Sequence, residues 1–153
     1  MRIALRSSAG MLAVLLLSGA ACSGSLMTDP ATRVDVSIAR NAYTSGDTVI
    51  AVVRNLGAVT LTYPYGFCKT ALQREQGGIW STVLLPPDGC PLALGILAPG
   101  ASVPLQYVLP SNVPGGLYRL TMPAPVPKDA AAPEPDLATP PFTVNSVILG
   151  APL

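Results

Sequence analysis

The sequence predicts an all-β fold, a single antiparallel Greek-key sandwich of about seven strands. Seventeen prolines and 14 glycines among 153 residues place many turns along the chain, and charged residues make up only 11% of it. Beyond the N-terminal region the apolar residues recur with the two-residue period of strands, and no stretch keeps a helical period. Short runs of this kind, regularly spaced, are typical of a β-sandwich.

The N-terminus has the features of an export signal. Arg2 and Arg6 give a positive start, residues 9–17 form an apolar run too short to span a bilayer, and small residues follow it up to Cys22. About 130 residues remain after cleavage, enough for one domain. The sequence therefore divides into a signal peptide 1–21, a flexible tether 22–32, a β-sandwich 33–146 and an apolar C-terminal tail 147–153.

The position of Cys22 resembles the lipobox of bacterial lipoproteins, in which the cysteine becomes the lipid-modified first residue of the mature chain. Gly19 departs from that pattern, because leucine is commoner three residues before the cysteine. The resemblance implies a membrane anchor at Cys22, and Ser23 after it resembles the signal for sorting to the outer membrane. Cleavage to a freely secreted product is the alternative.

The strand candidates follow the tether in order. Residues 34–38 alternate apolar and polar side chains, as a strand with one buried face does. Residues 48–54 are apolar on both faces, so either a loop covers Ile50 and Val52 or these two form an outer patch. Pro104 lacks an amide hydrogen and places its strand at an edge or a bulge. The remaining candidates are 59–63, 70–75, 79–84, 92–97, 102–109, 117–122 and 142–144.

Two of these candidates form a hairpin with a cysteine at each outer end. Gly77-Gly78 supplies the turn between 70–75 and 79–84, and pairing of the strands returns Cys68 and Cys90 to one end of the sheet. We expect a Cys68–Cys90 disulfide, which leaves no cysteine over if Cys22 is acylated. Two free buried thiols are the alternative. Trp80, the single tryptophan, is expected to anchor the core.

An aromatic segment precedes the hairpin. Tyr63, Tyr65 and Phe67 are interrupted by proline and glycine, and they serve either as packing beside the disulfide or as a recognition loop. For a binding surface we choose this segment over residues 123–141, which hold seven prolines and no aromatic side chain. That proline-rich stretch is expected to be an extended surface loop.

The chemistry of the side chains excludes most catalytic sites. The chain has no histidine, which removes the usual nucleophile systems and His-bearing zinc sites, and it has only eight acidic residues. We therefore expect no enzyme activity, no catalytic residues, no cofactor and no metal site. After signal cleavage seven basic residues stand against eight acidic ones, so no basic stripe offers itself to nucleic acid.

Several motifs resemble the immunoglobulin-like domains of bacterial cell-envelope proteins. They are the run 34–49, Arg54-Asn55, the turn 97–100 and the run 114–120, in which Tyr118 resembles the tyrosine-corner position. The chain is more distantly similar to the bacterial intracellular proteinase inhibitor domain. The first resemblance implies a lipid-anchored binding or scaffold module whose partner is another envelope protein or a glycan. The second implies a protease inhibitor in the periplasm or at the cell surface.

Overall fold

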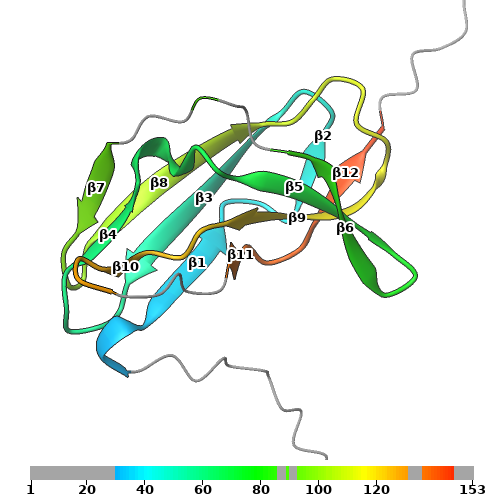
Figure 1. Ribbon diagram of the computed structural model, residues 1–153. Helices are drawn as coiled ribbons and strands as arrows, with labels where there is room; N and C mark the ends of the chain where they lie inside the picture. The colour runs from blue at the N-terminus through cyan, green and yellow to red at the C-terminus, as the bar shows by residue number, and fades with distance from the viewer. Residues whose placement is uncertain (1–29, 86–88, 90–92, 131–135, 147–153) are drawn as a thin grey trace, which may run out of the picture.

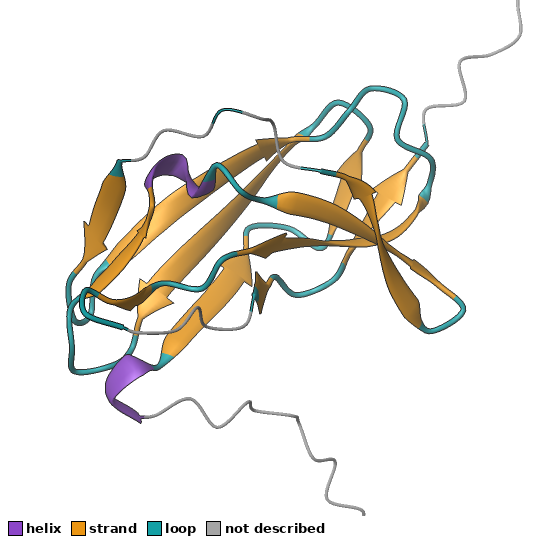
Figure 2. Ribbon diagram, viewed as in Figure 1, coloured by secondary structure: helices purple, strands orange, loops and turns teal. Residues whose placement is uncertain are grey.

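The structure is a computed structural model that describes residues 30–85, 89, 93–130 and 136–146. Strands dominate the described chain and stack in layers around a single core (Figures 1 and 2). No helix within the described ranges is long and apolar enough to cross a membrane. The predicted signal peptide 1–21, Cys22, Cys90 and the tail 147–153 lie outside the described residues, and the predictions made for them stay predictions.

Two of the three sheets have three strands each. In the first, β3 is central and pairs antiparallel with both neighbours; in the second, β4 is central. The first sheet contains β1 (Val34–Ile38), β3 (Thr48–Asn55) and β8 (Ser102–Val108), and the second contains β10 (Val126–Pro127), β4 (Leu61–Pro64) and β7 (Leu94–Leu97).

The largest sheet has the order β2-β12-β9-β5-β6, with β11 paired to β9. All its pairings are antiparallel except that of β2 with β12, which is parallel. Apart from the β5–β6 hairpin, neighbouring strands in this order are not consecutive in sequence, so their connections leave the sheet, as in a Greek key. Its strands are β2 (Ala42–Thr44), β12 (Phe142–Asn145), β9 (Gly116–Met122), β5 (Ala71–Gln76), β6 (Ile79–Leu84) and β11 (Leu137–Ala138).

The core lies between the layers and follows the alternation of the strands. Val49, Ala51 and Val53 of β3 are fully buried, and Leu120 and Met122 of β9 are buried likewise. Ile50, on the opposite face of β3, is 42% exposed, and Val52 is half-buried. The apolar residues on this second face therefore form an outer strip, which decides between the two alternatives left open by the sequence.

The fold class is confirmed, with more strands than expected. The described residues form twelve strands, because β2, β10 and β11 are short pieces of two or three residues that carry no readable period. The described parts of the proline-rich stretch, 123–130 and 136–141, contribute β10 and β11. Pro104 lies on β8, which is an edge strand as predicted.

Two expectations need correction. Trp80 lies outside the core cluster: it pairs with Glu75 on the outer face of its sheet, where the Arg119 guanidinium lies 4.4 Å from its ring centroid. Residues Pro30–Thr32, assigned to the tether, form a short 3-10 turn, η1. The Ala31 carbonyl accepts hydrogen bonds from the amides of Ala58 and Val59, so these residues of the predicted tether are bound to the sandwich.

Candidate binding groove

The loop between β8 and β9 is held by side chains from three other places in the fold. Three successive carbonyls of this loop each accept one hydrogen bond. The Ser45 hydroxyl donates to Val113 O at 2.7 Å, the Tyr118 hydroxyl to Pro114 O at 2.7 Å, and Arg74 Nη2 to Gly115 O at 2.8 Å. The loop is therefore fixed at consecutive peptide groups, and a surface built on it is pre-organised for binding.

Tyr118 is the tyrosine corner predicted from the sequence. Its ring is fully buried near the start of β9, and its hydroxyl returns to the backbone four residues upstream, as in immunoglobulin-like sandwiches. Burial raises the pKa of the Tyr118 phenol, and the nearby Arg74 charge lowers that pKa in part. The corner thus couples the start of β9 to the loop before it.

Arg74 reaches this corner from the neighbouring strand β5. It is the cross-strand partner of Tyr118, and its guanidinium carbon lies 5.8 Å from the centroid of the Tyr118 ring. Gly116 leaves room for it, since a Cβ at that position would lie 2.9 Å from Arg74 Nε. A side chain at residue 116 would therefore push the guanidinium away from the corner.

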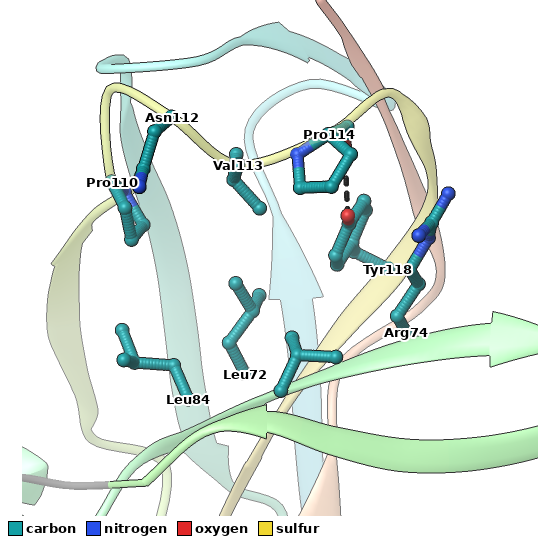
Figure 3. Close-up of a pocket in the computed structure, with 9 residues that line it drawn as sticks. Leu72, Arg74, Leu84, Pro110, Asn112, Val113, Pro114 and Tyr118 are labelled. Atoms are coloured by element: carbon teal, nitrogen blue, oxygen red, sulfur yellow. Dashed lines mark hydrogen bonds between the residues drawn. The ribbon is translucent and has the colours of Figure 1, made fainter.

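A groove with a volume of about 330 Å³ opens between this loop and the β5–β6 hairpin (Figure 3). Leu72 of β5 is fully buried beneath it, while Leu84 of β6 is 41% exposed at its border. The volume falls at the lower end of the range of ligand sites. The nine lining residues are Leu72, Arg74, Val83, Leu84, Pro110, Asn112, Val113, Pro114 and Tyr118.

Among the described residues, Arg74 is the one charged residue that lines the groove, and no acidic side chain of these residues forms an ion pair with it. The ion pair found among the described residues joins Arg40 and Asp47 instead. Arg74 Nε is fully buried, Nη2 donates to the Gly115 carbonyl, and Nη1 makes no hydrogen bond to the described residues. The groove therefore combines apolar walls with a positive charge whose Nη1 donors have no acceptor in this part of the chain.

Beside the groove, β6 is an edge strand of the largest sheet, and no other described strand pairs with its outer side. Its sequence, residues 79–84, contains no charge and no proline, and Ile79 is 68% exposed. The other outer strands are blunted or shorter: β1 carries Asp35, β8 carries Pro104, β10 has two residues including Pro127, β2 has three residues and β7 has four. In the described chain β6 is thus the longest edge that lacks the usual protection against strand pairing.

The aromatic segment predicted to bind a partner is mostly internal. Tyr63 and Phe67 are buried and stacked with their ring centroids 4.8 Å apart, and only Tyr65, which is 63% exposed, offers its ring to solvent. Residues Tyr65–Phe67 form a 3-10 turn, η2, that ends at Cys68. The side chain of Cys68 is not a free thiol in the structure, but Cys90 is outside the described residues, so the Cys68–Cys90 bridge stays a prediction.

The sequence did not single out Arg74, Leu72 or Leu84. A groove of this kind depends on loop carbonyls that accept hydrogen bonds from residues as far apart in sequence as Ser45 and Tyr118. No local sequence pattern predicts such contacts. The unprotected edge was the one visible signal, because residues 79–84 form an apolar strand without a gatekeeping charge.

No family model and no curated protein matches this chain. Among solved structures it is similar to the ASH/PapD-like domain of human CEP192 (PapD-like domain 7), with a TM-score of 0.41 and 12% identity over 94% of this chain and 98% of that one. It is also similar to Spo0M, a sporulation control protein from Bacillus subtilis, with a TM-score of 0.41 and 14% identity over 76% of this chain and 49% of that one. The strand order and the corner at Tyr118 are those of an immunoglobulin-like sandwich.

Proposed function

We propose that this protein is a non-catalytic binding module, lipid-anchored through Cys22 in the bacterial envelope, that captures an extended segment of a partner protein by strand addition at β6. The export signal, the cysteine after it and Ser23 support the anchor and the outer-membrane location. The free edge of β6 carries the proposal of strand addition, and it favours a protein partner over a glycan because a backbone edge recognises another backbone.

The backbone of β6 has groups available for such pairing. The β5–β6 ladder closes on the pair Gln76 and Ile79 around the two-residue turn Gly77-Gly78, where φ is positive at both glycines. A two-residue turn of this type is flanked by a hydrogen-bonded pair, and such pairs alternate with non-bonded ones along an antiparallel ladder. The N–H groups of Trp80 and Thr82 therefore point away from β5, toward the open side.

The edge strand also presents exposed apolar side chains. Ile79, Val83 and Leu84 are all exposed on β6, and the last two border the groove. An added strand would cover this apolar surface while it pairs with the backbone. No contact among the described residues favours the alternative of a protease inhibitor.

Proline substitution at the edge tests this function. A library of random twelve-residue peptides is selected on the immobilised mature domain, and the enriched peptides are titrated against Thr82→Pro and the matched control Thr82→Ala. Proline removes the outward N–H of residue 82 and is tolerated on an edge strand, while alanine keeps that N–H. Circular dichroism and thermal unfolding establish that both variants are folded.

We expect the peptides to bind Thr82→Ala like the wild type and Thr82→Pro at least about tenfold more weakly, since the variant loses a backbone hydrogen bond and the close approach of the added strand. Strand addition at β6 is wrong if no peptide is enriched, or if the proline and alanine variants bind equally well.

A further inference from the structure

The groove beneath β6 has a chemistry that strand addition alone does not use. A backbone edge accepts many sequences, whereas the groove offers an apolar cavity lined by an arginine that pairs with no acid among the described residues. Such a combination selects for a ligand group that is apolar on one side and anionic on the other.

We propose that the groove takes the carboxyl-terminal residue of the captured peptide, with its apolar side chain against Leu72, Leu84 and Val113 and its carboxylate on Arg74. This inference rests on the proposed function, because it names the end of the same extended segment that pairs with β6. The remaining residues of the peptide run along β6, whose end at Leu84 borders the groove.

The state of Arg74 supports a carboxylate over a neutral group. Its guanidinium pairs with no acid in the described chain and makes one hydrogen bond there, from Nη2 to Gly115 O, which leaves Nη1 without an acceptor among the described residues. Because guanidinium and carboxylate pair with matched geometry, a carboxylate in the groove would supply acceptors for the Nη donors; Nε is buried and takes no part. The guanidinium already lies against the Tyr118 ring, in space that the absence of a side chain at Gly116 leaves open. Little conformational freedom is therefore lost on binding.

The size of the groove fits one residue rather than a long chain. Its volume of about 330 Å³ is near the minimum for ligand sites. Its apolar lining consists of aliphatic side chains and prolines beside the Tyr118 ring, which suits a branched aliphatic side chain such as leucine or valine.

A pair of small probes tests the carboxylate without requiring strand addition. N-acetyl-leucine and N-acetyl-leucinamide have the same side chain and differ in the terminal charge. Each is titrated into the mature domain while NMR follows the methyl groups of Leu72, Leu84 and Val113. We expect the acid to bind about tenfold or more tightly than the amide, the size of a charge-assisted hydrogen bond.

Two substitutions locate the charge. Arg74→Gln should remove the preference for the acid while the amide still binds, and Arg74→Lys, which keeps a positive charge, should retain part of the preference. Equal binding of acid and amide to the wild type, or no binding of either, overturns the proposal. So does a preference for the acid that survives in a folded Arg74→Gln variant.

A longer probe separates this inference from the proposed function. The pentapeptide acetyl-Thr-Val-Thr-Val-Leu with a free carboxylate should bind more tightly than N-acetyl-leucine, and Thr82→Pro should remove only that gain. If the gain is absent while acid and amide still differ, strand addition fails and the carboxylate site remains.

The apolar tail of the chain is the alternative occupant that a truncation tests. Ser146, whose hydroxyl accepts a hydrogen bond from the Gly115 amide, directly precedes the apolar residues 147–153. A variant without residues 147–153 should bind N-acetyl-leucine like the full mature chain. Binding that occurs only after this truncation would make the tail the occupant and would overturn the proposal.

Discussion

The side-chain amide of Asn55 donates a hydrogen bond to the backbone carbonyl of Leu97, 42 residues later, at 3.0 Å. The same amide nitrogen donates to Val59 O at 2.8 Å, and the amide oxygen accepts from the Gly57 N–H at 2.9 Å. Asn55 is fully buried, so this one side chain ties the end of β3 to the following turn and to the end of β7.

We expect Asn55→Asp to be strongly destabilising. The substitution keeps the size of the side chain but replaces the donor with an oxygen that faces two carbonyls, and each buried group left unsatisfied costs roughly 1–3 kcal/mol. Urea unfolding measures the loss. The matched control is Asn41→Asp at an exposed position, where a change within about 0.5 kcal/mol is expected. Equal stabilities of the two variants would contradict the role of Asn55.

Tyr118→Phe tests the corner and its pH dependence. At pH 7 the loss of the bond to Pro114 O should cost about 1 kcal/mol. Because burial raises the pKa of Tyr118, the unfolded chain loses this proton first as the pH rises above about 10, so the stabilisation present below that pH is lost as it rises through the folded pKa.

The wild type should therefore lose stability in alkali, and Tyr118→Phe should lose less. Burial also raises the pKa of Tyr107, so Tyr107→Phe serves as the comparison that divides the alkaline effect between the two phenols. Unfolding free energies measured by urea from pH 8 to pH 11 check this. An alkaline slope in Tyr118→Phe identical to that of the wild type would be inconsistent with a raised pKa at this residue.

The pattern of the sequence predicted those parts of the fold that depend on local alternation and turns. Gly77 and Gly78 have φ values of 61° and 84°, as the predicted hairpin turn requires. The prediction that Trp80 lies in the core was wrong because it rested on the size of the side chain and not on the position of Trp80 in the alternation of its strand. As the partner of Glu75 it shares the outer face with that charged residue, and the alternation from buried Leu72 places it there.

Local sequence patterns could not predict the groove. It exists because Ser45, Arg74 and Tyr118, from three separate segments, bond to three successive carbonyls of one loop. The short strands β10 and β11 were missed for a related reason, since two residues cannot show a period. Pairing partners distant in sequence decide such features.

The predicted bridge between Cys68 and Cys90 is tested by mass spectrometry of a non-reduced digest, which should contain the two linked peptides. Cys68→Ala should cost about 2–5 kcal/mol of stability. The double variant Cys68→Ala/Cys90→Ala should be no less stable than the single one, because the bridge is already lost. Alkylation of both thiols in freshly isolated native protein would rule the bridge out.

Lipidation at Cys22 is tested by labelling cells with an alkyne fatty acid. Cys22→Ala should abolish the label and release a soluble protein, because the acyl chains supply the membrane affinity. Cys68→Ala is the matched control and should keep the label. A labelled, membrane-bound Cys22→Ala variant would mean that the anchor lies elsewhere.

Hydrogen exchange at single amides of β6 tests strand addition most directly. In the free domain the N–H groups of Trp80 and Thr82 should exchange fast, and those of Ile79 and Ser81, which point toward β5, should exchange more slowly. A bound peptide should slow Trp80 and Thr82 by about tenfold or more and leave β7 unchanged. Protection at β7, or at no strand edge while the peptide is bound, would contradict strand addition at β6.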